Sequence, residues 1–279
     1  MVTNDGGWDT TASMVFIKPG SWPSDEKPYE LLYIPTDESP TSNYEVHTVP
    51  NIPVRDMRPS LEALDLDRHG FIVASLASAL RYENIRDEKA LRDVYAAELR
   101  HLLLETLGAR AVFIHECVLR KRPSDAGATH QGYGQPIPIA HTDYTPGYVH
   151  KLVDQLVPGE KASLVKDRRF QMLNVWKPLR GPLRDWPLAL CDLQSLQPEH
   201  LVALDEVHAQ QSLESQHVLY DPAQRWHYLS NQQAHELLIF KAADSVVPGE
   251  VPHASFLDPR APTDGAPRES IEFRVLVVY

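Results

Sequence analysis

Ile137-Pro-Ile-Ala-His-Thr-Asp143 is a short apolar run that ends in a histidine and an aspartate separated by one residue. In an extended strand, side chains two residues apart project from the same face, so His141 and Asp143 would converge on one point. Imidazole and carboxylate together suit Fe(II), which does not require sulfur ligands. A His-x-Asp pair also occurs by chance, and Asp143 could instead form a hydrogen bond in a turn and cap the helix that follows. The pair therefore predicts half of a metal site.

Two later features supply the other half. A single histidine, His253, is followed by Arg268-Glu-Ser-Ile-Glu-Phe-Arg274. Two histidines and one carboxylate can occupy one face of an octahedral iron, which leaves three positions for a chelating co-substrate and O2. An arginine downstream of the second histidine can hold the far carboxylate of a 2-oxo acid. His253 alone could be an ordinary turn residue after Pro252. In this order, His141, Asp143 and His253 predict the metal ligands and catalytic centre of a non-haem iron oxygenase.

The C-terminal segment is predicted to be a strand with one polar and one apolar face. The polar face carries Arg268, Ser270, Glu272 and Arg274, and the apolar face carries Ile271, Phe273 and Val275. Buried charges are costly unless they are paired, and a dicarboxylate co-substrate would provide the pairing. If the strand were at the edge of its sheet, the same charges could instead form a surface ion-pair ladder.

Arg268 and Ser270 are the preferred clamp for the co-substrate, because a guanidinium fork and a hydroxyl can both donate to one carboxylate. A turn through Asp258-Pro259 and Thr263-Asp264-Gly265 would return Arg268 to the metal. Arg274 is the second candidate, and it could also bind the substrate or pair with Glu272.

The segment Phe170–Trp176 is predicted to be a strand with a polar residue in it. Asn174 in an otherwise apolar strand is expected to orient a ligand or the co-substrate, and alternation places Trp176 on the same face. Tyr144, Trp176 and Tyr228 are candidate substrate-pocket residues. Lys177 is a further candidate near the pocket. For Trp176 the alternative is plain core packing.

The composition excludes several classes of protein. The 279 residues carry a formal net charge of −11, which argues against a nucleic-acid partner. No apolar run approaches the roughly 18 residues needed to span a bilayer, and Met1–Trp8 lacks an apolar signal core. The two cysteines, Cys117 and Cys191, do not make a disulfide framework, so we expect reduced thiols and a cytoplasmic location. A small-molecule substrate and a monomer or homodimer are the expected partners.

The pattern of elements predicts a mainly β protein with flanking helices. Glu88 to Leu107 is the clearest helix, with apolar residues at helical spacing and a stop at Gly108, and Tyr148 to Leu156 is a shorter one. Dense short strands joined by turn-rich loops, with 23 prolines in the chain, favour a double-stranded β-helix (jelly-roll) barrel. We expect a single domain over residues 1–279. Its strands and supporting helices at 1–109 would precede a jelly-roll catalytic core at 110–279.

The predicted strands are spread along the whole chain. They are Met14–Ile17, Tyr29–Ile34, a turn and strand within Asp65–Ala74, Ala111–Leu119, Ile137–His141, Phe170–Trp176, Leu188–Cys191, Ser212–Tyr220, Arg225–Leu229, Glu236–Lys241, Val251–Phe256 and Ser270–Tyr279.

Four segments resemble one known family. They are Asn174-Val-Trp-Lys-Pro-Leu179, Asp185-Trp-Pro-Leu-Ala-Leu-Cys-Asp192, Pro252-His-Ala-Ser-Phe256 and Pro267-Arg-Glu-Ser-Ile-Glu-Phe-Arg274. Together they resemble the hydroxylase/desaturase family of fungal secondary-metabolite clusters, to which bacterial cephamycin-pathway hydroxylase components look related. The resemblance covers about residue 110 to residue 279, while the first hundred residues match only loosely.

The resemblance implies an Fe(II)- and 2-oxoglutarate-dependent dioxygenase, an oxidoreductase that also consumes O2. It places the metal at His141, Asp143 and His253 and the 2-oxoglutarate arginine on the last strand. Members hydroxylate, desaturate or close rings, including aziridine formation on an amino acid, and each outcome begins by abstracting a hydrogen from a C–H bond. Three alternatives stay open: an iron oxidase that uses no 2-oxo acid, a metal-dependent hydrolase or cupin-type isomerase, and a binding protein without oxygenase activity.

Overall fold

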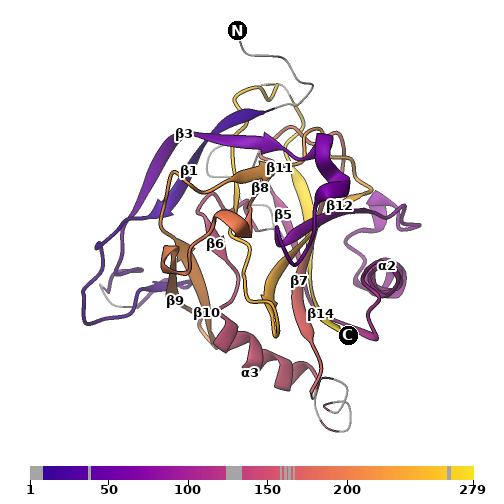
Figure 1. Ribbon diagram of the computed structural model, residues 1–279, viewed down its shortest axis with the longest axis horizontal. Coiled ribbons are helices and arrows are strands. Elements are labelled where there is room, and N and C mark those ends of the chain that lie inside the picture. Colours follow the sequence, from indigo (N-terminus) through magenta and orange to yellow (C-terminus); the bar gives the residue numbers. More distant parts are fainter. Residues whose placement is uncertain are drawn as a thin grey trace.

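The computed structural model describes residues 9–36, 39–123, 134–157, 159, 162, 165, 167–262 and 265–279. The segment Met1–Trp8 and the Thr263-Asp264 part of the predicted turn lie outside these residues. Two sheets dominate the described part of the chain, with helices at their outer face and at one end (Figure 1). The predicted class, mainly β with flanking helices, is confirmed.

The smaller sheet, called sheet B, is antiparallel in the order β4-β12-β7-β14-β5. Its strands are β4 (Phe71–Ser75), β12 (Glu236–Asp244), β7 (Phe170–Pro178), β14 (Glu269–Val278) and β5 (Ala111–Lys121). The last strand, β14, lies between β7 and β5 and is not an edge. Its charged residues therefore do not form the surface ladder considered above.

The larger sheet, called sheet A, has the order β1-β3-β11-β8-β13-β6-β10-β9-β2. Its strands are β1 (Thr10–Ile17), β3 (Val46–Asp56), β11 (Trp226–Tyr228), β8 (Leu188–Cys191), β13 (His253–Ser255), β6 (His141–Thr142), β10 (Ser212–Val218), β9 (Leu201–Val207) and β2 (Tyr29–Leu31). From β5 to β8 and again from β11 to β14, the chain alternates between the two sheets. This alternation is that of a double-stranded β-helix, so the predicted barrel is confirmed.

The N-terminal strands are part of both sheets. β3 pairs with β11 and β4 pairs with β12. Behind sheet A, Phe16 of β1 packs edge-on against Trp226 of β11, in a cluster that includes Phe256. These contacts support our proposal that the chain forms one domain.

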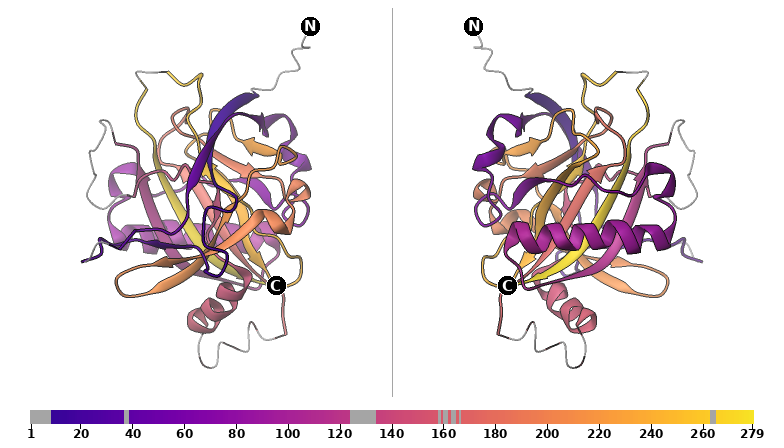
Figure 2. Two further views of the ribbon diagram at one scale, coloured as in Figure 1. Left: turned by 90° about the vertical axis from the view of Figure 1, so that its left-hand side faces the viewer. Right: turned by 90° about the vertical axis from the view of Figure 1, so that its right-hand side faces the viewer.

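Helices cover the outer face of sheet B. The predicted helix over 88–107 is present as α1 (Glu88–Ala90), a π-helical segment (Leu91–Tyr95) and α2 (Ala96–Leu107). It begins at Asp87, whose side chain accepts hydrogen bonds from the amides of the first turn, and ends at Gly108 with φ of 62°. Figure 2 shows α2 lying across the sheet, where Leu99 and Leu103 pack in one cluster with Val175 and Phe273 of the strands.

The predicted helix at 148–156 is α3 (Pro146–Leu156), capped by the Thr145 side chain, and it closes one end of the barrel below β7 and β14 (Figure 1). Short 3-10 turns occur at Arg58–Ala63, Tyr82–Asn84, Leu193–Ser195 and Pro198–His200.

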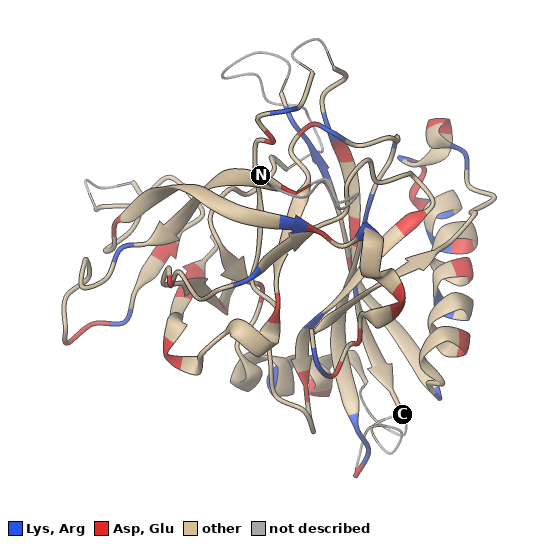
Figure 3. Cartoon of the chain, turned by 45° about the horizontal axis from the view of Figure 1, so that its top comes forward, with Lys and Arg blue, Asp and Glu red and all other residues tan. Residues whose placement is uncertain are grey.

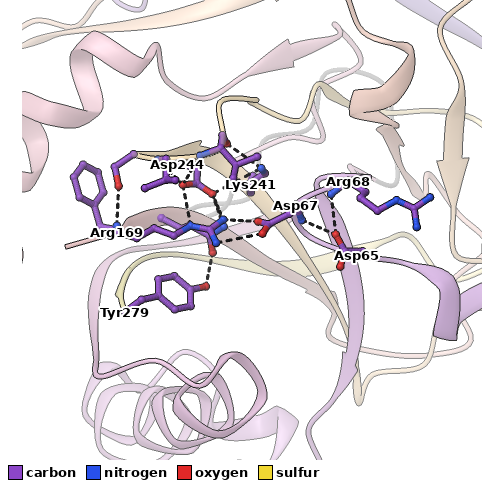
Figure 4. A network of polar contacts seen from close by, with 12 residues as sticks. Asp65, Asp67, Arg68, Arg169, Lys241, Asp244 and Tyr279 are labelled. Atoms are coloured by element: carbon purple, nitrogen blue, oxygen red, sulfur yellow. Dashed lines mark hydrogen bonds and ion pairs between the residues drawn. The ribbon is translucent and has the colours of Figure 1, made fainter.

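A polar network joins distant parts of the chain near this end (Figure 4). Arg169, just before β7, forms ion pairs with Asp244 at the end of β12 and with Asp67 in the turn before β4. The fully buried ammonium of Lys241 donates to the carbonyl of Val247 at 3.1 Å and lies 3.8 Å from Asp244. The network anchors the loop that leads from β12 to His253.

Charge is spread over the molecule. Acidic and basic residues are interspersed on most elements (Figure 3). The formal net charge of the whole sequence is −11. Among the described residues, no helix is both long and apolar enough to cross a bilayer.

Candidate metal centre

Three predicted ligands meet inside the barrel. His141 on β6 and His253 on β13 are cross-strand partners, with ring centroids 4.3 Å apart. Asp143 directly follows β6, and its Oδ2 lies 3.8 Å from His253 Nε2. One potential ligand atom from each residue lies within 4.8 Å of the other two, and all three residues are buried. The two adjacent strands therefore bring together residues that are far apart in the sequence.

Backbone carbonyls fix the orientation of both imidazole rings. His141 Nδ1 lies 2.8 Å from the carbonyl oxygen of Ile139, and His253 Nδ1 lies 3.2 Å from that of Val251. A carbonyl can only accept a hydrogen bond, so each Nδ1 carries a proton and Nε2 is the ring atom left to bind a metal. Burial, and then the charge of His253, lower the pKa of His141 well below its ordinary value. The low pKa keeps His141 neutral, as a metal-binding imidazole must be.

Asp143 is held as a carboxylate by two neighbours. Arg274 Nη2 donates to its Oδ1 at 2.6 Å, and the side-chain amide of Asn174 donates to its Oδ2. Burial alone would raise the pKa of Asp143, but Arg274, the two histidines and the Asn174 hydrogen bond lower it below its ordinary value. Arg274 and Asn174 are themselves cross-strand partners on β14 and β7.

These donors fit a divalent iron. Two neutral imidazoles and one carboxylate form the donor set that suits Fe(II). Two buried atoms beside Asp143, Asn174 Oδ1 and Arg274 Nε, have no hydrogen-bond partner within the part of the chain that the structure describes. Buried polar atoms normally have partners, so a further polar group is expected at this site.

Arg268 lies in the same small cavity as the three predicted ligands. The cavity, about 20 Å³, is lined by His141, Asp143, His253, Arg268, Trp176, Ser255, Glu272, Arg120, Ile137 and Leu188. Arg268 Nη1 donates to Ser255 Oγ at 2.7 Å and to the Trp186 carbonyl at 2.6 Å, and its Nε donates to Ser270 Oγ at 3.2 Å. Its guanidinium carbon lies 4.9 Å from the centroid of the Trp176 ring.

The two arginines of β14 differ in their partners. Arg268 is 2% exposed, and among the described residues no carboxylate forms an ion pair with its guanidinium. Burial, and then the nearby charge of Arg120, lower the pKa of Arg268 to about 9. Arg274, in contrast, pairs with Asp143 and with Glu116 at 2.6 Å, and with Glu272 at 3.4 Å. Of these two arginines, Arg268 is therefore the one whose charge no described carboxylate pairs with.

The remaining predicted site residues lie at different distances from the cavity. Trp176 lines it, and Tyr144 lies nearby, with its ring centroid 5.4 Å from the Arg274 guanidinium carbon. Tyr228 instead packs in the cluster behind sheet A, where its hydroxyl accepts a hydrogen bond from Arg260 at 2.5 Å. It is not among the residues that line the cavity at the triad.

Sequence reasoning missed several residues around the site, among them Ser255 and Glu116. Ser255 follows His253 by two residues on β13, so the alternation of the strand could have revealed it. Glu116 reaches Arg274 only because β5 pairs with β14, and nothing local in the sequence shows that pairing.

Comparison with known proteins identifies the family. Residues 14–278 match a family model described as an oxidoreductase/YMDC permease-like domain. The chain is 33% identical over 273 residues to the Fe(II)/2-oxoglutarate-dependent dioxygenase nvfI of Aspergillus novofumigatus. The aligned region covers 95% of this chain and 95% of that protein. It belongs to this dioxygenase family. The predicted enzyme class and the resemblance to fungal secondary-metabolite oxygenases are thereby confirmed.

One further relative and one solved structure match most of the chain. The hydroxylase/desaturase efuI of Hormonema carpetanum is 29% identical over 250 residues, or 81% of this chain and 82% of that protein. The solved structure of the iron and alpha-ketoglutarate-dependent endoperoxidase NvfI superposes with a TM-score of 0.85 at 30% identity, and covers 97% of this chain and 98% of that one. Proteins similar to this chain are thus named for different oxidative outcomes.

Proposed function

We propose that this dioxygenase binds Fe(II) through His141, Asp143 and His253, binds 2-oxoglutarate through Arg268, and oxidises a C–H bond of a small molecule in secondary metabolism. The observation that carries the proposal is a buried His-Asp-His cluster in the same cavity as Arg268, whose guanidinium forms no ion pair with any of the described residues. A dicarboxylate co-substrate bridging the two would supply both the missing anion and further ligands.

Each residue has a distinct part in this proposal. With 2-oxoglutarate and O2 present, bound iron supplies the oxidising power to abstract a hydrogen atom, while the co-substrate becomes succinate and CO2. Arg268 holds the far carboxylate, with Ser255 and Ser270 as hydroxyl partners on either side of the guanidinium. Trp176 supports the face of that guanidinium and keeps water away from it.

Arg274 and Asn174 act through Asp143 rather than through the co-substrate. They bond different oxygens of the carboxylate and hold it charged and in one orientation. Such outer contacts usually tune the affinity of a metal site. Asn174, a predicted cofactor-binding residue, is therefore assigned to orientation of the metal ligand, and Arg274 to the same task.

The outcome of the reaction depends on which C–H bond lies beside the iron. Hydroxylation, desaturation and ring closure, including aziridine formation, all use the same triad, so the substrate pocket decides among them. Tyr144 is the aromatic side chain beside Arg274 that we propose for that pocket. We also propose a cytosolic monomer or homodimer without nucleic-acid or membrane partners; the free thiols of Cys117 and Cys191 support that compartment.

Anaerobic reconstitution tests the proposal. The protein is loaded with Fe(II), 2-oxoglutarate is added, and the weak visible charge-transfer band of the chelate is recorded. We expect the band in the wild type and in an Asp205→Ala surface control, and its loss in Asp143→Ala. Full iron loading without the band would favour an oxidase that uses no 2-oxo acid. Failure to bind iron would favour a binding protein, and turnover with zinc under nitrogen would favour a hydrolase or isomerase.

A further inference from the structure

Lys177 occupies an unusual place for a lysine. It lies on β7, opposite Ile271 of β14, and is 9% exposed. Alternation along β7 places it on the outer face with Val175 and Leu179, which belong to the apolar cluster under α2. The adjacent Trp176 points the other way, toward the metal cavity. Lys177 is therefore separated from the proposed active site by the thickness of the sheet.

No anion is paired with this lysine. Among the described residues, none forms an ion pair or a hydrogen bond with its ammonium, which lies 5.0 Å from the centroid of the Tyr95 ring. Glu98 on α2 acts on it electrostatically, but the oxygens of Glu98 accept hydrogen bonds from the Ser78 hydroxyl, at 2.5 Å, and from the Ala79 amide, at 3.0 Å. Burial lowers the pKa of Lys177 to about 8.

Lys241 shows the usual arrangement for comparison. It is also buried on sheet B, on β12, but its ammonium has the Val247 carbonyl at 3.1 Å and the Asp244 carboxylate at 3.8 Å. A buried charge is costly unless it is paired and hydrogen-bonded. Lys177 has only the face of an aromatic ring as compensation, which is a weaker partner than a carboxylate.

A cavity of about 290 Å³ opens beside Lys177. The segment Leu76–Ile85 forms one wall, the end of β7 with Lys177 and Leu179 forms another, and Ala234 with His235 closes the side. Two hydroxyl groups at the cavity are already engaged, because Ser78 donates to Glu98 and Tyr82 donates to Glu269. Among the described residues the walls are thus mainly apolar, and Lys177 contributes an ammonium that has no ion pair there.

We propose that this cavity is a second small-molecule site, which takes an organic monocarboxylate with the ammonium of Lys177 as its counter-ion. One cation matches one carboxylate, and the side chains of Leu76, Leu80 and Leu179 match a hydrocarbon portion. A second carboxylate would lie among these leucines without a partner. The site therefore discriminates against dicarboxylates, including the proposed co-substrate 2-oxoglutarate.

Titration calorimetry of the full-length protein with hexanoate tests this site. We expect saturable binding to the wild type, and binding at least about tenfold weaker for hexanamide, which has the same size but no charge. Lys177→Met and Lys177→Gln should each weaken hexanoate binding by a similar factor, because both keep the side-chain length approximately and remove the charge. The control variant Lys89→Met, which changes an exposed lysine of α1, should bind hexanoate as the wild type does.

Two results would overturn the proposal. One is hexanoate binding that survives both Lys177 variants, or that is absent from the wild type up to about 10 mM. The other is binding lost in Arg268→Met but kept in Lys177→Met, which would show that the probe occupies the proposed active site. Circular dichroism of each variant confirms its folding, and because the two sites lie on opposite faces of β7, either assignment can fail without the other.

Discussion

At the scale of single residues, the structure separates two arginines that the sequence left as alternatives. Within the described part of the chain, the guanidinium of Arg268 bonds hydroxyl and carbonyl groups but no carboxylate, whereas Arg274 forms ion pairs with three carboxylates. The polar face of the C-terminal strand was predictable from alternation. The different partners of Arg268 and Arg274 could not be predicted, because they depend on the position of β14 between β5 and β7.

We predict that Arg268→Met raises the 2-oxoglutarate concentration needed for half-maximal turnover by about a hundredfold, the effect of losing a bidentate charge-assisted contact. Iron affinity should stay unchanged, because Arg268 contacts none of the three proposed ligands. Steady-state kinetics and iron titration measure the two effects separately. If Arg274→Met raises the co-substrate requirement and Arg268→Met does not, the clamp is assigned to the wrong arginine.

Asn174→Ala tests the support of Asp143. Removing the amide leaves one carboxylate oxygen without its donor, so we expect Fe(II) affinity to fall about 10- to 100-fold. Competition with a metal-sensitive dye measures this change. Asn43→Ala is the matched control, since Asn43 bonds the backbone near β2, far from the triad in the sheet order. Equal iron affinity in the two variants would contradict the assigned role.

Lys177→Met carries a prediction about pH. The folded pKa of Lys177, about 8, lies below the ordinary value of 10.5, so the unfolded chain binds more protons between these values. The charged lysine therefore costs stability below pH 8, and the cost disappears as the pH rises toward 10.5. The free energy of unfolding of Lys177→Met, measured in urea, should be higher than that of the wild type by up to about 3 kcal/mol at pH 7 and by much less at pH 10. If the difference in stability between Lys177→Met and the wild type were the same at pH 7 and pH 10, Lys177 would not be a buried charge with a lowered pKa.

At the scale of elements, the sequence pattern predicted most strands of both sheets, including β1, β2 and β4 near the N-terminus. The predicted strands at Phe170–Trp176, Leu188–Cys191 and Glu236–Lys241 lie within β7, β8 and β12. Two strands, β3 and β9, were not predicted. β3 contains Pro50 and Pro53, which remove backbone donors and disguise a strand, although β3 pairs with β1 and β11 on its two sides.

Local signals also failed where a strand is very short. The predicted strand Val251–Phe256 is reduced to His253–Ser255, and the one leading to His141 is reduced to two residues. Such pieces are held by neighbouring strands rather than by their own propensity. The spacing of His141 and Asp143 was therefore enough to suggest the metal site, but the convergence of His253 on it depends on the pairing of β13 with β6.

The end of β12 yields a prediction about stability. Asp244 accepts hydrogen bonds from Arg169, Gln171 and the amides of residues 246 and 247, and its side chain is fully buried (Figure 4). Asp244→Asn removes the charge that pairs with Arg169 and Lys241, so unfolding should become easier by about 3 kcal/mol, as for a broken buried ion pair. Urea denaturation measures the loss. Asp93→Asn, on an exposed ion pair, should cost less than about 1 kcal/mol, and equal losses would contradict the network's role.

At the scale of the whole molecule, sheet B separates two kinds of surface. Its inner face carries the two arginines of the proposed active site, Arg268 and Arg274, while its outer face is mainly apolar and covered by α2 (Figure 2). β1 and β3 extend sheet A, and their apolar side chains pack with those of β8, β11 and β13 in one cluster. The N-terminal strands thus complete the packing of the catalytic barrel instead of forming a separate layer.

This arrangement predicts that the chain unfolds as one cooperative unit. Phe16 of β1 is fully buried against Trp226 and Tyr220, so Phe16→Ala should destabilise the protein by about 3–5 kcal/mol. Because β3 pairs with β11 and β4 pairs with β12, that loss should reach the entire barrel. Hydrogen exchange in increasing urea should therefore show amides of β3 and of β7 losing protection at one shared midpoint, lowered equally in Phe16→Ala. An earlier midpoint for β3 alone in the variant would divide the chain into two units and reject the single domain.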